Sequence, residues 1–492
     1  MNCWDVLVVG AGNAGLSAAL AAKEAGASVL VLERAPLAAR GGNSRFTGGG
    51  FRVAYRSSDE LSRIIPDLTQ KELAERFATP YPPEEFMDEL GELTSYRADP
   101  DLVERIAVDG LDAVAWLREK GVRFLPMHGW HGLTIQSAGG GQGLMDSLFA
   151  AVDKAGIDVW YDARATDLLF DGRSVNGVSV LHDGERVEVE AKSVILAAGG
   201  FQANAEWRTR YLGAGWDIVP VRGTWCNTGD GIAMALAVGA QPHGQWSGAH
   251  AVAWDFHAPA FGDVRVGDGF QKHSYPMGIV VNARGERFVD EGANFLDYTY
   301  ARYGKEMLAQ PGQIAWQVFD AKQTSHLRDE YRIRGVSRLA AATLPDLARK
   351  MEGIDAEAFL HTIEEFNASI DTSVPLDLTI LDGRRANTAV PKSNWADPVT
   401  EGPFEAYPVT CGITFTFGGV RVDTSARAIG YDGRPVDALY AIGEMAAGVF
   451  YFNYPGGSGL TKGVVEGRTA GREAAELAAT RIATARPTRA AG

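Results

Sequence analysis

The sequence predicts an α/β fold in which a dinucleotide-binding domain is interrupted by an inserted α+β domain. The first 33 residues read as strand, glycine turn, helix, strand and acid, which is the pattern of a parallel β-α-β unit. Histidines and aromatic residues become frequent from residue 243, and the α/β pattern returns from about residue 370. We therefore expect the dinucleotide-binding domain at 1–242 and 370–492, with the inserted domain at 243–369.

The N-terminal unit carries the residues that a dinucleotide requires. Gly10 permits a tight turn after the first strand, Gly12 lets the backbone approach a pyrophosphate, and Gly15 lets the helix pack against the sheet. The N-terminus of the following helix offers free N–H groups to the phosphates. Glu33 ends the second strand, where a carboxylate accepts hydrogen bonds from a ribose diol. A carboxylate at this position argues against the 2′-phosphate of NADP. The Rossmann-like unit is therefore expected to bind FAD or NAD.

Further glycine-rich segments are predicted to bring backbone against the same ligand. Residues 40–50 form a glycine-rich loop. Residues 175–182 and 186–191 are expected to form a hairpin, and a separate buried strand is expected from Ser193, ending in glycines at 199–200. Residues 227–231 begin a helix, in which Thr228 and Asp230 are also ordinary capping types. Residues 453–463 are again rich in glycine, before a helix expected from about Val464.

Composition and charge exclude several classes of partner. The chain has 492 residues, 47 basic and 62 acidic, and a net charge of −15, which disfavours nucleic acid and anionic membranes. Cys3, Cys226 and Cys411 share no metal-ligand spacing, so no metal site is expected. The first strand begins by residue 4, which leaves no room for a signal peptide, and no apolar run is long enough to span a bilayer. We expect a cytoplasmic protein.

Few residues outside the glycine motifs indicate chemistry by themselves. A histidine among aromatic residues, such as His250, is more often structural than functional. Arg52 and Arg222 could each pair with a substrate carboxylate, or form surface salt bridges. Lys272 and Tyr300 are expected at the surface or in packing.

Taken together, the motifs resemble the fumarate reductase and succinate dehydrogenase flavoprotein family, almost from end to end. The segments that carry the resemblance are Gly10-x-Gly12-x-x-Gly15 with Glu33, Gly41-Gly42-Asn43-Ser44, Ala197-Ala198-Gly199-Gly200, Asn227-Thr228-Gly229-Asp230-Gly231, Gly285-Glu286-Arg287-Phe288-x-x-Glu291, Phe417-Gly418-Gly419 and Leu439-Tyr440-Ala441-x-Gly443-Glu444. The resemblance implies FAD bound in a Rossmann-like domain beneath a capping domain. It also implies hydride exchange between flavin N5 and a carbon next to an activating group.

The resemblance further implies a set of cofactor-binding residues. These are Gly10, Gly12, Asn13, Ala14, Gly15, Glu33, Arg34, Gly42, Asn43, Ser44, Thr47, Gly49, Gly50, Ala165, Ala198, Gly199, Gly200, Asp230, Gly443, Glu444, Ser458, Gly459 and Leu460. Respiratory members attach FAD through a histidine in the loop that here holds Ser44. No histidine lies between residues 34 and 60, so we expect non-covalent FAD.

Three departures from the fumarate reductase pattern affect the expected chemistry. Residues 292–295 lack the arginine proton donor, Phe415 replaces a substrate-binding histidine, and Tyr454 replaces an arginine. His250 does match a substrate-binding histidine. The loop that begins at Tyr454 resembles that of the tricarballylate dehydrogenase branch, and its tyrosine is similar to that of 3-ketosteroid Δ1-dehydrogenases.

We therefore predict an FAD-dependent dehydrogenase that oxidises a saturated C–C bond next to a carboxylate or carbonyl, with a tricarballylate-like polycarboxylate as the favoured substrate. The predicted catalytic residues are His250, Tyr454 and Arg222, and the predicted substrate-binding residues are Arg52, His273, Arg302 and Phe415. An enoate or fumarate-type reductase, a ketosteroid-type oxidation and a non-catalytic flavin electron-transfer subunit are the alternatives. Because no second nicotinamide-binding motif is visible, electrons are expected to leave to a separate acceptor, such as oxygen, a quinone or a membrane-linked protein.

Overall fold

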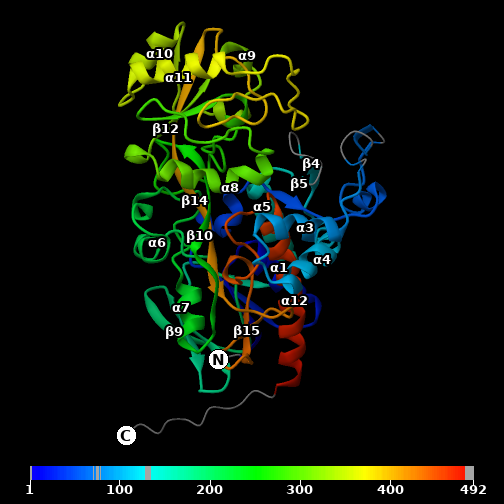
Figure 1. Cartoon of the computed structure of the whole chain (residues 1–492). Coiled ribbons are helices and arrows are strands. Elements are labelled where there is room, and N and C mark those ends of the chain that lie inside the picture. The colour runs from blue at the N-terminus through cyan, green and yellow to red at the C-terminus, as the bar shows by residue number, and fades with distance from the viewer. Residues whose placement is uncertain (1–2, 70, 74–76, 78, 128–133, 482–492) are drawn as a thin grey trace.

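A computed structural model describes residues 3–69, 71–73, 77, 79–127 and 134–481. Its lower half in Figure 1 is built on an eight-stranded sheet with the central order β15-β16-β9-β1-β2-β6. The strands are β1 (Trp4–Val9), β2 (Val29–Leu32), β6 (Asp158–Trp160), β7 (Arg164–Phe170), β8 (Val175–His182), β9 (Glu185–Leu196), β15 (Arg427–Ile429) and β16 (Pro435–Ala441). β1 lies between β2 and β9, parallel to both. The predicted α/β class and β-α-β unit are confirmed.

One predicted division within this sheet is wrong. A hairpin arm at 186–191 and a separate buried strand from Ser193 were expected, but β9 is one continuous strand of 12 residues. Its first half pairs with β8 and its second half pairs in parallel with β1. A change from alternating to continuous apolar residues marks the point at which both faces of the strand become buried, so it does not mark a strand end.

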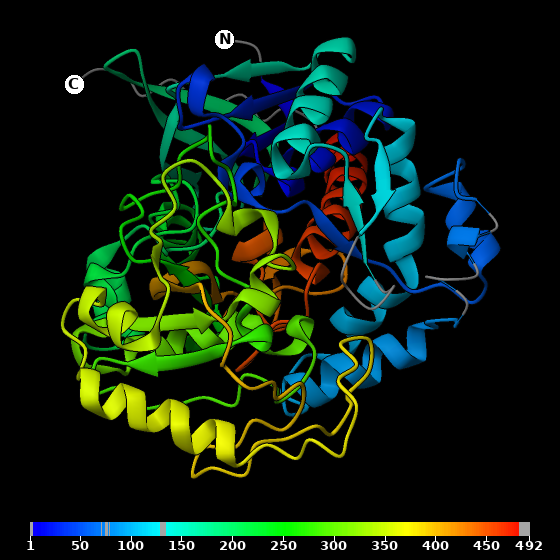
Figure 2. The same ribbon diagram turned by 90° about the horizontal axis from the view of Figure 1, so that it is seen from above.

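Two glycine-containing helices cover one face of the sheet. α1 (Asn13–Glu24) packs against α12 (Ser458–Thr480), and both views show them side by side (Figures 1 and 2). A Cβ on Gly471 would lie 2.3 Å from the Ala18 carbonyl oxygen, so the helices cross too closely for a larger residue. α12 begins six residues before the predicted Val464, because Gly457, with φ +82°, forms a left-handed N-cap.

The upper half of the molecule is a capping region built on an antiparallel sheet in the order β10-β14-β12-β11, with β13 beside β14. The strands are β10 (Pro242–Asp255), β11 (Ile279–Asn282), β12 (Ala315–Phe319), β13 (Leu339–Ala341) and β14 (Phe404–Val420). Its helices are α8 (Leu296–Leu308), α9 (Ala321–Thr324), α10 (Leu344–Lys350) and α11 (Ala356–Ala368). β14 runs from the capping region down into the dinucleotide-binding region (Figure 1).

The domain boundaries remain predictions, but the packing favours moving the second one. Ala386, Val399 and Phe404 share a hydrophobic cluster with Ile279 and Phe359 of the capping region. The expected boundary at 369/370 therefore divides this cluster, and a later boundary within β14 would keep it intact.

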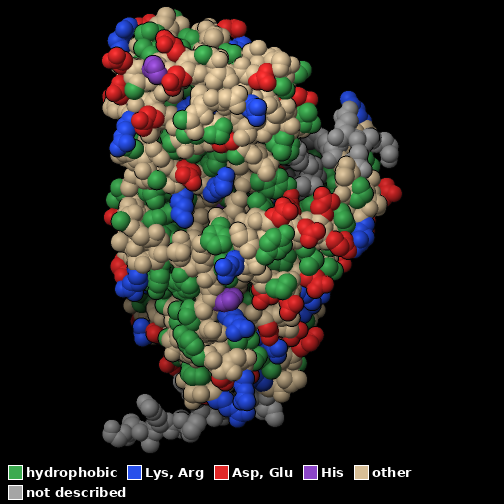
Figure 3. All heavy atoms as spheres, in the orientation of Figure 1, with side chains coloured by type: hydrophobic (Ala, Val, Ile, Leu, Met, Phe, Trp, Pro, Cys, Tyr) green, Lys and Arg blue, Asp and Glu red, His purple; other side chains and the backbone are tan. Residues whose placement is uncertain are grey.

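The remaining elements surround the two sheets. The helices are α3 (Pro83–Leu93), α4 (Pro100–Glu119), α5 (Gly140–Lys154), α6 (Ala205–Leu212) and α7 (Asp230–Ala237), and a small sheet contains β3 (Gly50–Arg52), β4 (Phe124–Pro126) and β5 (Thr134–Ser137). Acidic side chains gather over α3 and α4 on the face shown in Figure 3. Among the described residues, the structure contains no helix with the length and apolar character needed to cross a membrane.

Candidate active site

A cavity of about 290 Å³ is lined by residues from both regions. The predicted cofactor residues line it, with the exceptions of Gly15, Gly49, Gly200 and Ser458. The predicted catalytic residues His250, Tyr454 and Arg222 line it as well, together with His273 and Phe415. One continuous cavity therefore joins the dinucleotide motif to the predicted substrate residues.

The turn after β1 fits a pyrophosphate. Gly10 has φ +105°, and a Cβ there would lie 2.4 Å from the Ala197 carbonyl oxygen, so only glycine fits. A Cβ on Gly12 would meet nothing closer than 3.5 Å, at Ser44 Oγ. Gly12 therefore keeps the backbone open toward the cavity at the N-terminus of α1, where free N–H groups stabilise an anion. These residues fit the diphosphate of a dinucleotide.

The four predicted cofactor residues that do not line the cavity act through packing. Added Cβ atoms would lie 2.0 Å from the Gly10 carbonyl oxygen for Gly15, 2.3 Å from Ser137 Oγ for Gly49 and 2.2 Å from Glu444 Oε1 for Gly200. Ser458 is buried, and its hydroxyl donates to the Pro455 carbonyl oxygen at 2.6 Å. Each of these residues therefore positions a segment that lines the cavity. A sequence motif does not distinguish such a packing residue from one that would touch the cofactor.

Two buried carboxylates mark the ends of the predicted FAD site. Glu33 accepts hydrogen bonds from the backbone N–H groups of Ala11, at 3.1 Å, and Ala35, at 2.8 Å, while burial raises its pKa. Glu444 accepts from the Thr416 N–H at 2.8 Å and from Gln202 Nε2 at 3.2 Å, and burial raises its pKa to about 7. Both carboxylates are thus held in fixed orientations and face the cavity.

The loops between these carboxylates are tied together by hydrogen bonds. Ser44, in η2 (Gly42–Phe46), accepts from the Asn13 N–H at 3.1 Å. Asn43 donates to the Thr414 carbonyl oxygen at 2.7 Å and so joins this loop to β14. Arg34 forms an ion pair with Asp230 at 3.2 Å. Segments far apart in the sequence therefore form one cradle.

A row of rings forms the wall of the cavity on the substrate side. The ring of His250 lies 4.7 Å from that of Tyr454 and 5.0 Å from that of Tyr300, and Tyr300 lies 5.2 Å from His273. Burial lowers the pKa of both histidines well below the usual value, and nearby Arg222 lowers both further. Within the described part of the chain, no ring nitrogen of either histidine has a hydrogen-bond partner. Both therefore present neutral imidazoles that can exchange a proton.

Tyr454 lies where this row of rings meets the glycine-rich loop that precedes α12. Its hydroxyl oxygen accepts from the Gly459 N–H at 2.8 Å, and its ring packs on Phe450 at 4.8 Å and Phe415 at 5.9 Å. Burial raises the pKa of the phenol, so it stays protonated at neutral pH. The N–H group fixes the hydroxyl oxygen, and the hydroxyl proton is available to donate to an oxygen atom of a ligand.

Arg222 is less available than expected. Its Nε and Nη2 donate to the two carboxylate oxygens of Asp268 at 2.5 and 2.6 Å, and Nη1 donates to Thr414 Oγ1 at 3.3 Å. The side chain lines the cavity, but the bidentate face of its guanidinium is already occupied by a carboxylate.

Arg52 and Arg302, which were predicted to bind substrate, do not line the cavity. The Arg52 guanidinium is buried, contacts Glu89 and Asp297, and donates to the Gly456 carbonyl oxygen at 2.8 Å. Arg52 therefore stabilises the loop that carries Tyr454 without lining the cavity itself. Arg302 is exposed on α8 and lies over the ring of Tyr303.

Lys272 and Tyr300 were expected at the surface or in packing. Lys272 is fully buried, and its ammonium donates to backbone carbonyl oxygens that include those of Phe270, Gln271 and Glu330, at 3.1 to 3.3 Å. Tyr300 lines the cavity between the two histidines. No sequence motif predicts where these two side chains lie, because both locations depend on the tertiary fold of the capping region.

Sequence motifs also did not identify three residues of the capping region that line the cavity, namely Asp268, Gln271 and Arg328. Arg328 immediately precedes η7 (Asp329–Tyr331). These residues lie outside the motifs that carry the family resemblance, so no spacing signal identified them.

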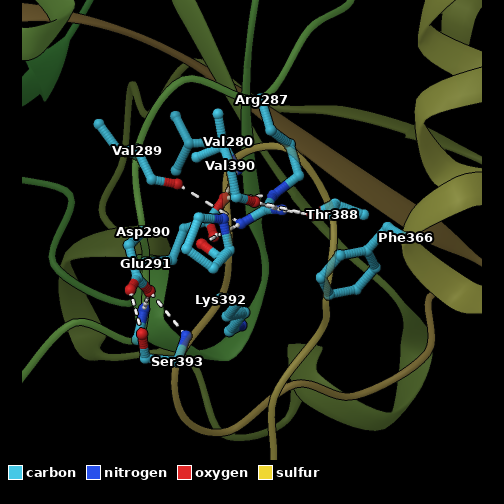
Figure 4. A network of polar contacts seen from close by, with 12 residues as sticks. Val280, Arg287, Val289, Asp290, Glu291, Phe366, Thr388, Val390, Lys392 and Ser393 are labelled. Carbon is cyan, nitrogen blue, oxygen red and sulfur yellow. Dashed lines mark hydrogen bonds and ion pairs between the residues drawn. The ribbon is translucent and has the colours of Figure 1, made fainter. Parts of the chain in front are cut away.

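The Arg287–Glu291 segment is a structural clamp. Arg287 donates to Thr388 Oγ1 at 2.9 Å and to the Val390 carbonyl oxygen at 2.7 Å, and it pairs with buried Glu291 (Figure 4). Lys392 donates to the Gly278 carbonyl oxygen at 2.7 Å. These bonds join residues 278–291 to 388–393 within the capping region. The segment therefore supports the sheet without reaching the cavity.

Known proteins share this architecture. A family model described as FAD binding domain matches residues 5–460. NADH:fumarate oxidoreductase of Klebsiella pneumoniae (strain 342) is 29% identical over 96% of this chain, which spans 48% of that protein. The 4-oxocyclohexanecarboxylate 2-dehydrogenase of Sinomonas cyclohexanicum is 29% identical over 96% of this chain and 94% of its own length.

Among solved structures, the open conformation of a flavocytochrome c3 fumarate reductase has a TM-score of 0.75 and 28% identity, over 96% of this chain and 78% of that one. The match to the family model covers most of the chain and includes the glycine motif and both buried carboxylates. The chain therefore belongs to the FAD binding domain family, as a flavoprotein of the fumarate reductase and succinate dehydrogenase type, and it is an FAD-dependent oxidoreductase.

Proposed function

We propose that the protein oxidises a saturated C–C bond next to a carbonyl or carboxylate carbon. The observation that carries this proposal is the buried phenol of Tyr454, fixed by the Gly459 N–H at 2.8 Å in the loop that precedes α12. FAD, when bound, supplies the acceptor for the hydride that leaves the β-carbon. The remaining chemistry is done by residues of the chain.

Tyr454 is suited to polarise the activating carbonyl. Its hydroxyl donates to the carbonyl oxygen, on which negative charge develops when the α-proton leaves. A donor that is already oriented in a buried site stabilises this charge without a large reorganisation cost. Hydrogen bonding at the oxygen therefore acidifies the neighbouring C–H group.

His250 is the proposed base. Its ring touches that of Tyr454, and its lowered pKa keeps the imidazole neutral and able to accept a proton from the α-carbon. His250 takes the proton from the α-carbon as the hydride leaves the β-carbon, so that a C=C bond forms between the two carbons.

The charge balance of the cavity favours a substrate with few carboxylates. Arg222 is paired with Asp268 at 2.5 Å, and Arg328 is paired with Glu330 at 3.0 Å. Three carboxylates of a tricarballylate-like substrate would bring negative charges that these arginines only partly compensate. We therefore place a carbonyl compound with at most one carboxylate ahead of the polycarboxylate that the loop resemblance favours. The name of the Sinomonas relative describes one oxo and one carboxylate group.

The reductase alternative has less support. The stretch at 292–295 contains no arginine, and the residue at 454 is a tyrosine, so the two arginines of the fumarate reductase pattern are missing. An electron-transfer subunit would not require a row of histidine and tyrosine rings in contact with the cavity. A ketosteroid-type oxidation uses the same chemistry as the proposal and differs in the size of the substrate.

An anaerobic reduction experiment tests the proposal. The oxidised enzyme is mixed with 4-oxocyclohexanecarboxylate or with tricarballylate, and the visible absorbance of the flavin is followed. We expect the oxo acid to bleach the flavin, and tricarballylate to do so much more slowly. If only tricarballylate bleaches the flavin, the polycarboxylate assignment is correct. If neither does so while reduced enzyme converts fumarate to succinate, the protein is a reductase.

A further inference from the structure

Arg328 presents an unused guanidinium fork to the cavity. Its Nε donates to Glu330 Oε1 at 3.0 Å, whereas Nη1 and Nη2 have no acceptor within the described residues. Its side chain is 29% exposed, and the residue lines the cavity. Arg222 differs, because Asp268 already occupies its bidentate face. Arg328 is therefore better placed than Arg222 to receive a carboxylate in the fork geometry that guanidinium groups favour.

The position of Arg328 is fixed by the capping region. Its backbone N–H donates to Ser274 Oγ at 3.1 Å, and the Ser274 N–H donates to the Tyr331 hydroxyl oxygen at 2.8 Å. Lys272 adds a bond to the Glu330 carbonyl oxygen at 3.3 Å. Three contacts thus join the segment of Arg328 to residues 272–274, which include cavity-lining His273.

Arg328 lies at the end of the ring row that is remote from Tyr454. The order along the wall is Tyr454, His250, Tyr300 and His273, with neighbouring ring centroids 4.7 to 5.2 Å apart. The backbone N–H of Arg328 bonds to Ser274, the residue after His273, and the side chains of Arg328 and His273 both line the cavity. A substrate can therefore lie along this wall with different polar groups at its two ends.

We propose that Arg328 binds a carboxylate of the substrate, so that the substrate is an oxo acid with its carbonyl at Tyr454 and its carboxylate at Arg328. This inference rests on the proposed function for the identity of the carbonyl end. Glu330 holds Nε and leaves the two terminal nitrogens to form parallel hydrogen bonds with the carboxylate. His273 has no described partner for its ring nitrogens, and the single N–H of its neutral imidazole can donate a third hydrogen bond to the carboxylate.

The test compares an acid with its uncharged amide. 4-Oxocyclohexanecarboxylate and 4-oxocyclohexanecarboxamide share the ring and the ketone, and they differ in the charge that Arg328 would bind. We expect wild-type kcat/KM to favour the acid, and Arg328→Gln to reduce this preference by about 10- to 100-fold, as for a lost charge-assisted hydrogen-bond pair. Arg334→Gln is the matched control, because Arg334 is exposed in the same segment and does not line the cavity.

A binding measurement separates this inference from the proposed function. Both compounds are titrated into the oxidised holoenzyme, and their dissociation constants are obtained from the change in the flavin spectrum. If neither compound reduces the flavin, the proposed reaction fails, but tighter binding of the acid that depends on Arg328 still supports the carboxylate site. An equal effect of Arg328→Gln on acid and amide, or no effect on either, overturns the inference. So does the absence of measurable binding of the acid to the wild type.

Discussion

Tyr454 is the residue on which the proposed chemistry depends most directly. Replacing it with phenylalanine removes the hydroxyl and keeps most of the ring packing against Phe450 and His250. We expect kcat with an oxo acid to fall by about 10²- to 10³-fold, as when one oxyanion donor is lost. Steady-state kinetics with a dye acceptor measure this, and the FAD content should be unchanged. Tyr431→Phe, at an exposed site, is the control. An unaltered kcat in Tyr454→Phe would exclude the phenol from the reaction.

The two buried histidines predict how stability depends on pH. Burial depresses their folded-state pKa values below the ordinary value of 6.5, so the unfolded chain binds protons more readily. Their contribution to stability is therefore fully present above pH 6.5 and is lost as the pH falls through that value toward the folded pKa. The free energy of unfolding should fall by up to about 1.4 kcal/mol per pH unit for each histidine.

Urea unfolding between pH 7.5 and 5 measures this slope. His273→Gln should reduce the slope, whereas His361→Gln, on an exposed face of α11, should leave it unchanged. If the slope in His273→Gln equals that of the wild type, protonation of His273 does not cause the acid sensitivity.

Site residues that belong to a sequence motif were easier to predict than site residues outside any motif. Gly10 and Glu33 follow from spacing, because strand ends and helix starts determine where such residues lie, whereas the role of Glu444 follows from the family resemblance. Arg328 and Asp268 could not be predicted, since they reach the cavity only through the folding of the capping region. Arg52 shows the opposite error, because its type suits a carboxylate but Glu89 and Asp297 already surround it.

At the scale of elements, the crossing of α1 and α12 holds the dinucleotide turn against the loop of Tyr454. Gly471→Ala places a Cβ 2.3 Å from the Ala18 carbonyl oxygen and 2.9 Å from Ala21 Cβ. In an exposed helix this change would stabilise by up to about 1 kcal/mol. Here overpacking should reverse the sign and lower the free energy of unfolding by about 1–3 kcal/mol. Chemical denaturation of the variant measures this, with exposed Glu476→Ala as the control on the same helix. A stabilised Gly471→Ala variant would show that the helices can separate without cost.

The elements themselves were largely predictable, and the errors have physical causes. The start of α12 at Ser458 was missed, because the glycines at 456 and 457 were expected to continue the loop, whereas Gly457 caps the helix. β9 was divided in the prediction because one half is covered on a single face and the other half on both. The local pattern of apolar residues indicates how many faces of a strand are buried, and in β9 this number changes within a single strand.

At the scale of the whole molecule, the dinucleotide-binding and capping regions share one cavity, so FAD should contribute to the stability of both. Ser44 stands at the position from which respiratory members attach FAD, and it accepts a hydrogen bond from the Asn13 N–H. We therefore expect acid precipitation to release yellow FAD into the supernatant. Flavin colour that stays in the pellet would contradict non-covalent binding. Added FAD should also raise the melting temperature of the apoprotein in a concentration-dependent manner.

The electron acceptor and the cellular compartment are properties of the whole protein that remain predictions. The net charge of −15 and the acidic side chains over α3 and α4 favour a partner whose docking surface is basic. Salt should therefore slow electron transfer to such a partner, while the reaction with a small neutral dye should respond less.

The central claim, oxidation of a C–C bond next to a carbonyl, is tested most directly by analysing the product of a single anaerobic turnover. Stoichiometric FAD-loaded enzyme is incubated with 4-oxocyclohexanecarboxylate, and the mixture is analysed by mass spectrometry. We predict one product molecule for each flavin reduced, lighter than the substrate by two hydrogen atoms and carrying a C=C bond conjugated to the ketone. An unchanged oxo acid, together with efficient conversion of fumarate to succinate by the reduced enzyme, would contradict the account.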